Sequence, residues 1–353
     1  MRRGAELSGL ALPLALVAAT ALLGALVSQS SQTYFTDALV NVAIVTALYV
    51  FVGNSGVLSF GHISFVALGA WTAGVLSVPV AEKPATMPGL AHFLAATHVA
   101  NVPSLALAAL VGGVVALVVG FPLTRLSGLS AGIATFAVLE ITHNLLQYET
   151  ALGPGTNTFS SVPETTGMLQ GAIGAGICVV AAFLYSRSRW GRLLRATRED
   201  AAAARAIGAS IHVQRLIAFT LSGALAGLAG GLYIHLLPLS IDSVFLDLTF
   251  ITLAMLVVGG SGSLLGAVVG ALLVSAVDSW FSLAENGTSL FGWHVDVPSG
   301  TTQIIVGTAM AAVLIFRPSG IIGPGAIRLP GLRRAGSAAD GQPTPTEGHP
   351  TPN

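Results

Sequence analysis

The chain has 353 residues, of which 53% are hydrophobic and only 8% are charged, and its formal net charge is zero. Soluble domains carry about 25% charged residues, so this composition excludes an ordinary soluble fold. The single cysteine, Cys178, lies in an apolar run, which excludes an internal disulfide and a cysteine metal cluster. We therefore expect an all-α, polytopic bundle of transmembrane helices.

About ten apolar stretches have the character of membrane spans. The first is longer than the apolar core of ~7–15 residues in a signal peptide, so we interpret it as a retained span. After Phe316 the chain turns to glycine, proline and scattered charge. This predicts a transmembrane domain at 1–323 and a disordered cytoplasmic tail at 324–353. The predicted spans are 7–28, 38–52, 63–80, 102–123, 129–147, 167–186, 216–238, 244–258, 263–282 and 300–316.

Two of these spans, 38–52 and 244–258, are short, and each precedes a break with the pattern G-x-S-G-x-L. Short, glycine-interrupted segments indicate a transport pathway. The alternative is a pair of ordinary turns whose glycines allow tight packing, and it stays equally open. The polar residues at the two breaks are candidates for the translocation path: Asn54, Ser55, Ser59, His62 and Ser261.

The fifth span carries Glu140, His143 and Asn144, which share one helix face by their spacing. Glu140 lies ~17 Å along the helix from Leu129, near the middle of a ~30 Å hydrocarbon layer. A charge there is costly, so we expect this face to point into the bundle or a cavity. Either Glu140 and Asn144 line the substrate route, or an internal Glu–His or Glu–Asn bond fixes helix packing. Asp278, near the outer end of its span, is expected to be solvated.

Basic residues are distributed unevenly around the ten spans. Fourteen of the fifteen fall on one side, and only Lys83 falls on the other. Short loops rich in Lys and Arg stay cytoplasmic, so both termini are expected there. Half of the fourteen lie in or beside one loop: Arg187, Arg189, Arg192, Arg195, Arg198, Arg205 and Arg215.

That loop contains SRWGRLLRATREDAAAARAIGAS, residues 188–210, which predicts a cytoplasmic helix of about five turns. Its Leu, Arg, Ala and Glu are good helix formers, and Gly208 stands where a helix end is expected. A solvated loop that only sets topology or contacts anionic lipid needs no such ordered helix. We therefore favour a docking helix for a cytoplasmic partner. One face carries only small or aliphatic residues: Leu194, Ala201, Ala204 and Ile207.

No catalytic constellation is present in the sequence. It has no P-loop, no G-x-S-x-G, no H-E-x-x-H and no G-x-G-x-x-G between a strand and a helix. No spacing around His62 suggests a metal site. We therefore predict a chain that is not an enzyme.

Several blocks, in order, resemble the membrane subunit of ATP-binding-cassette (ABC) importers for branched-chain amino acids, the LivM type. They run from about Gly53 to Gly323, and the cytoplasmic block is the most specific. The blocks are GNSGVLSFGHISFVALGAWTAGVL, AGIATFAVLEI, WGRLLRATREDAAAARAIGASIHVQRLIAFTLSGALAGLAGGLY, MLVVGGSGSLLGAVVGALL and FRPSGIIG.

The resemblance implies that the helix at 188–210 couples the permease to an ATPase subunit. The sequence departs from the family pattern in three ways. Ala202 replaces a glutamate of the broader E-A-A-x-x-x-G signature, and the I-x-L-P motif downstream of it is absent. Thr158 replaces a glycine in the loop GPGTNT. These departures bear on loop geometry and substrate rather than on the class. The coupling residues carried over are Gly191, Arg192, Arg195, Arg198, Glu199, Ala203, Ala204, Arg205 and Gly208.

By the same resemblance, the chain would work in the bacterial inner membrane beside a second permease subunit of the LivH type. Two cytoplasmic ABC ATPases would bind ATP and Mg²⁺, and an extracytoplasmic binding protein would deliver the amino acid. The chain itself would hold no cofactor and would contact lipid but no nucleic acid. Alternatives stay open: import of urea or another small amide, a less well matched sugar importer, a structural membrane subunit, and an ATP-independent channel or ion-coupled carrier. Few buried charges argue against ion coupling.

Overall fold

The computed structural model describes residues 2–206, 208–285, 301–316 and 320–323, and these parts of the chain form helices with no β-strand. Six helices are long and apolar enough to cross a membrane, which confirms the all-helical, multi-pass architecture. They are α2 (Gln29–Ser55), α6 (Asn101–Leu123), α7 (Leu129–Tyr148), α8 (Met168–Arg187), α11 (Ile211–Ile234) and α13 (Leu264–Glu285).

Four further apolar helices coincide with the remaining expected spans. They are α1 (Arg2–Ala25), α3 (His62–Ser77), α12 (Ile241–Gly259) and α14 (Thr301–Phe316). The apolar parts of α1, α3 and α12 are shorter than 18 residues, so the count of ten spans stays a prediction. The predicted tail at 324–353 lies outside the described residues.

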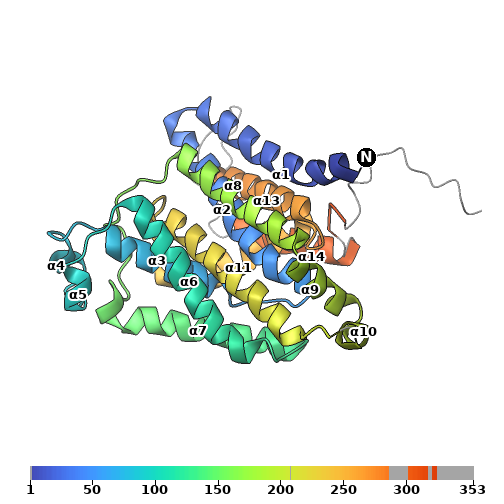
Figure 1. Ribbon diagram of the computed structural model, residues 1–353. Helices are drawn as coiled ribbons and strands as arrows, with labels where there is room; N and C mark the ends of the chain where they lie inside the picture. The colour runs from blue at the N-terminus through green and yellow to red at the C-terminus, as the bar shows by residue number, and fades with distance from the viewer. Residues whose placement is uncertain (1, 207, 286–300, 317–319, 324–353) are drawn as a thin grey trace, which may run out of the picture.

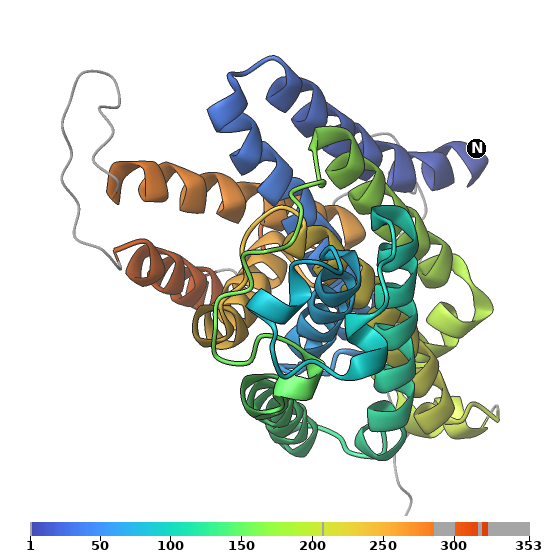
Figure 2. The same cartoon turned by 90° about the vertical axis from the view of Figure 1, so that its left-hand side faces the viewer.

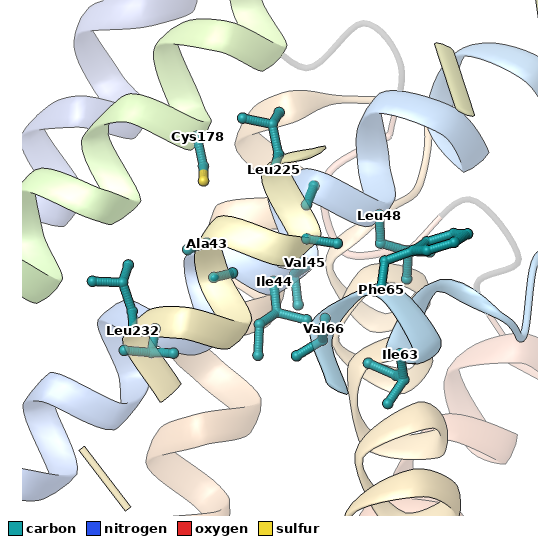
Figure 3. Close-up of a cluster of buried hydrophobic side chains, with 14 of the residues drawn as sticks. Ala43, Ile44, Val45, Leu48, Ile63, Phe65, Val66, Cys178, Leu225 and Leu232 are labelled. Carbon is teal, nitrogen blue, oxygen red and sulfur yellow. The ribbon is translucent and has the colours of Figure 1, made fainter. Parts of the chain in front are cut away.

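Helix α2 forms the centre of the bundle and packs against α11, α8 and α13 (Figure 1). Its middle residues are almost wholly buried because neighbouring helices surround it on all sides. In the close-up of Figure 3, Ala43, Ile44 and Leu48 of α2 face side chains of α3, α8 and α11. Helices α1 and α7 lie at opposite edges of the bundle in both views (Figures 1 and 2).

Glycines let α11 approach its neighbours backbone to backbone. A methyl group added at Gly230 would lie 1.9 Å from the Val66 carbonyl oxygen of α3. One added at Gly227 would lie 2.3 Å from the Ala108 carbonyl oxygen of α6. Small residues at such positions allow the close van der Waals packing that holds membrane helices together.

Short helices mark the two ends of the bundle. Helices α4 (Lys83–Thr86) and α5 (His92–Ala95) lie at one end, and α9 (Arg189–Glu199) and α10 (Ala201–Ala206) lie at the other, which is also the end where α1 begins (Figure 1). Lys83 is fully buried and its Nζ donates to the carbonyl oxygens of Leu94, at 2.8 Å, and of Thr97. The described arginine-rich segment and Lys83 are therefore at opposite ends, as the charge pattern predicts.

Two expected helices, the second span and the arginine-rich helix, differ from the prediction. The second span is not short, because α2 has 27 residues and begins at Gln29 rather than near residue 38. The polar start of α2 is helical because it is packed against other helices: Thr36 is buried, and its hydroxyl bonds within the helix to the Gln32 carbonyl oxygen at 2.9 Å. The eighth span is short as predicted, since its apolar part covers only Phe245–Gly259.

The arginine-rich segment is not one helix of five turns. It breaks into α9 and α10 at Asp200, whose backbone is extended, with φ −147° and ψ 106°. The Asp200 carboxylate accepts hydrogen bonds from the backbone N–H groups of Ala202, at 2.8 Å, and Ala203, at 2.9 Å. An acidic side chain at this position starts a new helix, so the break has a local cause in the sequence.

Candidate functional site

The candidate site is a junction at the α9 end of the bundle, formed by α9, the end of α2 at 53–56, and the turn between α12 and α13 at 259–263. The start of α9 is fixed by Ser188, whose Oγ accepts a hydrogen bond from the Gly191 N–H at 3.2 Å. Gly191 is buried, and a methyl group there would lie 2.3 Å from the Tyr185 carbonyl oxygen. Gly191 thus lets α9 turn tightly off the end of α8.

Two arginines of α9 attach to the end of α2. Arg195 Nη1 donates to Asn54 Oδ1 at 2.8 Å, and its Nη2 donates to the Ser186 carbonyl oxygen at 2.6 Å. Arg198 Nη1 donates to the Gly53 carbonyl oxygen at 3.0 Å. Cations are favoured at the C-terminal end of a helix, where carbonyl oxygens have no partner within the helix.

The end of α2 has a geometry that only glycine adopts readily. Gly56 has φ +70° and caps the helix by donating its N–H to the Val52 carbonyl oxygen at 2.9 Å. A methyl group at Gly56 would also lie 2.9 Å from the side chain of Arg198. The conformation and the contact both place Arg198 directly against the capped end of α2.

The two G-x-S-G-x-L breaks lie side by side at this junction. A methyl group at Gly53 would lie 2.8 Å from the Ser261 carbonyl oxygen in the α12–α13 turn. The segment 320–322 adds to the same turn, since Ile321 and Ile322 donate their N–H groups to the carbonyl oxygens of Val258, at 2.9 Å, and Gly259, at 3.0 Å. This is the tight packing that the alternative interpretation of the glycines expects.

The other predicted coupling residues divide between the core and the surface. Ala204 is buried, and Gly208 has φ +82°, as expected for a helix end. Arg192 bonds only locally, to the Arg187 carbonyl oxygen at 2.7 Å. The exposed residues are Arg192, Arg198, Glu199, Ala203, Arg205 and Gly208. Arg195 and Arg198 therefore hold α9 to its own chain, and the surface left for a partner is formed by the remaining exposed residues.

The predicted path residues at and just after the end of α2 are buried: Asn54, Ser55, Ser59 and His62. His62 Nδ1 lies 2.7 Å from Ser59 Oγ, and its ring packs among aromatic rings of Phe51, Phe65 and Phe219. Asn54 donates to the Val50 carbonyl oxygen at 2.9 Å and accepts from Arg195. In the described part of the chain, no group of three His, Cys, Asp or Glu side chains could hold a metal ion.

Glu140 and Asn144 lie apart from these residues, on α7. Glu140 Oε2 is 3.7 Å from His143 Nδ1, and Asn144 Nδ2 donates to the Glu140 carbonyl oxygen at 2.8 Å. The Glu–His contact agrees with the packing interpretation, but of the three residues only His143 turns toward this chain's own bundle. The Glu140 side chain is 40% exposed and Asn144 is exposed, while His143 packs on the Phe245 ring of α12 at 5.0 Å.

Sequence reasoning missed two acidic residues. Asp37 lies one residue before the predicted second span, and in the structure it is a half-buried part of α2. Its negative charge interacts with that of Asp278, which is half-buried rather than solvated. Asp247, on α12, is exposed although it belongs to an apolar helix. The polar stretch QSSQTYFTD hid the start of α2, so Asp37 falls outside the predicted span.

A bundle with six helices long and apolar enough to cross a membrane is the architecture of a multi-pass membrane protein. Residues 32–314 match the family model of the permease component of branched-chain amino acid transport systems. The chain belongs to this family of ABC permeases. The match confirms the resemblance seen in the sequence blocks and identifies a LivM-type permease.

Individual relatives agree with this assignment. LivM of Salmonella typhimurium, a high-affinity branched-chain amino acid transport permease, is 27% identical over 335 residues, or 84% of this chain and 71% of the relative. LivM of Escherichia coli K12 is 26% identical over 355 residues, or 90% and 75%. The autoinducer 2 import permease LsrC of Shigella flexneri is 29% identical over 154 residues, or 41% and 42%. No solved structure matches.

Proposed function

We propose that this chain is one permease subunit of an ATP-driven importer for branched-chain amino acids in the bacterial inner membrane. The family and the two LivM relatives support an amino acid substrate. The similarity to LsrC shows that related permeases serve other solutes. ATP and Mg²⁺ would be bound by two partner ATPases, and an extracytoplasmic protein would deliver the substrate.

The proposal that α9 couples this chain to an ATPase rests on the attachment of α9 to α2. Arg195 and Arg198 connect α9 to the last turn of the central helix, so a push on α9 would reach the bundle core without an intervening loop. The exposed surface of α9 and α10, with Arg192, Glu199 and Arg205, would bind the ATPase. Arginine is suited to such contacts because its planar guanidinium binds carboxylates through two parallel hydrogen bonds.

The translocation path is proposed to run along α7, between this chain and the second permease subunit. Only 33% of the apolar stretch of α7 is buried, a share that α6 also has, and the exposed side chains of α7 include Ile133 and Ile141. Glu140 sits near the middle of this helix, where exposure of a carboxylate to lipid is costly. A second permease subunit covering this face would remove that cost and would leave Glu140 and Asn144 lining the contact.

The substrate is tested by ATP-driven uptake into proteoliposomes that contain the chain, its second permease subunit, both ATPases and the binding protein. Labelled leucine competes with isoleucine, valine, urea, a sugar and autoinducer 2. We expect competition by the branched-chain amino acids alone. Uptake that is blocked by urea or autoinducer 2 but not by isoleucine would reject the proposed substrate.

The position of α7 is tested by cysteine crosslinking in membranes. Asn144→Cys is expected to crosslink to the second permease subunit, whereas Ile177→Cys, equally exposed but on α8, is not. The native Cys178 is buried and gives little background. Glu140→Gln is expected to slow uptake with unchanged assembly. If this substitution lowers the thermal stability and leaves the uptake rate unchanged, Glu140 serves packing and not the path.

A further inference from the structure

Basic side chains gather around one exposed aromatic ring where the end of α6 meets the start of α11. The Arg125 guanidinium lies 4.8 Å from the centre of the Phe121 ring. The His212 ring of α11 meets the same Phe121 ring edge to face, with the ring centres 5.5 Å apart. Phe121 thus places both basic groups beside one short stretch of the protein surface. We call Arg125, His212 and Arg215 the basic cluster.

Hydrogen bonds fix the geometry of the basic cluster. The Thr124 hydroxyl donates its proton to the Gly120 carbonyl oxygen at 2.8 Å, so it accepts from His212 Nδ1, also at 2.8 Å. Arg215 Nη1 donates to the Leu126 carbonyl oxygen at 2.9 Å. The loop after α6 is therefore tied to α11 at two points, and a ligand of the basic cluster would meet groups that are already positioned.

The positive charge of the basic cluster is not balanced nearby. Neither 101–139 nor 201–240, which contain α6 and α11, includes an aspartate or a glutamate. Among the described residues, no carboxylate forms an ion pair with the basic cluster. Arginine keeps its charge at any physiological pH, and the Arg125 side chain is exposed. The basic cluster therefore favours an anionic ligand.

Helix α6 leads from the hydrocarbon layer to the basic cluster along an apolar stripe. Its other face packs on α11, where a methyl group at Gly112 would lie 2.5 Å from the Gly223 carbonyl oxygen. The stripe from 110 to 121 extends ~17 Å along the helix, about half of a ~30 Å hydrocarbon layer. Its side chains are exposed and share one face by their spacing: Leu110, Val114, Leu117, Val118 and Phe121.

We propose that the basic cluster binds the phosphate of an anionic phospholipid whose acyl chain lies along the α6 stripe. Arginines beside a membrane span are suited to anionic headgroups. A soluble protein would reach the basic cluster but not the stripe, which lies within the span, whereas a phospholipid matches both. The bound lipid would join the ends of α6 and α11, and its binding does not depend on which substrate is imported.

Thermal unfolding of the purified chain in an uncharged detergent tests the ligand. Phosphatidylglycerol is compared with phosphatidylcholine of the same acyl chains and with inorganic phosphate. A ligand that binds only the folded state raises the melting temperature in a saturable way. We expect such a rise with phosphatidylglycerol alone. An equal rise with phosphatidylcholine would overturn the role of the charge, and an equal rise with inorganic phosphate would overturn the role of the acyl chain.

Variants of Arg125 test the basic cluster itself, because this exposed side chain is the one least needed for folding. Arg125→Gln should raise the half-saturating concentration of phosphatidylglycerol about fivefold, whereas Arg125→Lys should stay near the wild-type value. The matched control is Arg205→Gln, since Arg205 is an exposed arginine that bonds only to the Ala201 carbonyl oxygen. No shift in Arg125→Gln, or an equal shift in the control, would reject the basic cluster as the lipid site.

Cysteine crosslinking tests whether protein covers the α6 stripe instead. Val118→Cys lies on the stripe at an exposed position. In membranes that contain the assembled importer, it is expected to react with a lipid-soluble maleimide and to form no crosslink to another protein. A crosslink from residue 118 to any other subunit would show that protein occupies the stripe, and the lipid would then have no place on it.

Discussion

Replacing Arg195 with methionine removes the guanidinium that attaches α9 to α2, while the aliphatic stem is largely kept. Two hydrogen bonds are lost, to Asn54 Oδ1 and to the Ser186 carbonyl oxygen. Hydrogen bonds to a charged group contribute about 1.5–3 kcal/mol each, and Arg195 is only half-buried. We therefore expect about 2 kcal/mol in total, which raises the undocked population of α9 about thirtyfold.

Hydrogen exchange of the backbone amides at 192–199 measures this undocking in nanodiscs. The exchange rates in Arg195→Met should rise about thirtyfold, because each tenfold step corresponds to about 1.4 kcal/mol. Arg192→Met is the matched control, since Arg192 bonds only to the neighbouring Arg187 carbonyl oxygen. Unchanged exchange in Arg195→Met, or an equal rise in both variants, would refute the attachment of α9 through Arg195.

Three further changes test the fold around the site. Gly230→Ala should lower the free energy of unfolding by about 1–3 kcal/mol, because its methyl group meets a carbonyl oxygen of α3. The control Gly176→Ala, which has open space around the added methyl group, should show no such loss in thermal unfolding. Lys83→Met should leave two carbonyl oxygens without their donor, at about 1–3 kcal/mol each, and should speed proteolysis within 78–100. Asp200→Ala should release α10, seen as a more mobile spin label at residue 203, whereas Asp200→Asn should preserve the cap.

Asp200 also gives α10 a defined pH dependence. Hydrogen bonds from the N–H groups of Ala203 and Ala202 hold the pKa of Asp200 below its ordinary value of 3.8. Because its pKa is lower in the folded than in the unfolded state, the ionised carboxylate stabilises the cap fully at pH values above the unfolded pKa. This stabilisation is lost as the pH falls through the folded pKa. The spin label at residue 203 should therefore stay ordered at neutral pH and loosen only in strong acid. Asp200→Asn should show no such transition, and loosening already near neutral pH would contradict the cap.

Hydropathy located the helices well because it reports burial in lipid or protein, and ten apolar helices coincide with the ten expected segments. It failed where tertiary contacts extend a helix through polar residues. The start of α2 is such a case, since Asp37 and Asn41 are polar yet packed against α13. A polar sequence at a helix end looks like a loop until its partner across the bundle is known.

The arginine-rich segment is helical as predicted, although it forms two helices instead of one, and its docking role stays a prediction. Its individual arginines could not be assigned from the sequence. Spacing along one helix does not show which face meets the same chain. Arg195 and Arg198 donate hydrogen bonds to the end of α2, although Arg198 stays exposed, whereas Arg192 and Arg205 bond only to carbonyl oxygens nearby in the chain. The sequence did contain a signal for the break at Asp200 that the prediction of one continuous helix overlooked, because an aspartate before four alanines is a helix start signal.

The two glycine breaks were linked by pattern, and the structure places them in contact at the end of α2. Sequence could not distinguish a path from a packed joint, because both need small residues. Burial of Asn54, Ser55 and His62 favours the joint. Glu140 shows the opposite limit: the sequence places it near the middle of a helix, which the structure confirms, but its 40% exposure could not be read from the sequence of this chain.

The most direct test of coupling through α9 is the number of ATP molecules hydrolysed per leucine imported by the reconstituted importer. In the double variant Arg195→Met, Arg198→Met, we expect hydrolysis to continue while uptake per ATP falls about tenfold or more. Arg192→Met should stay nearer the wild-type ratio if its role is confined to the ATPase surface. A double variant that imports leucine at the wild-type ratio would contradict the proposal that α9 drives α2 through these two arginines.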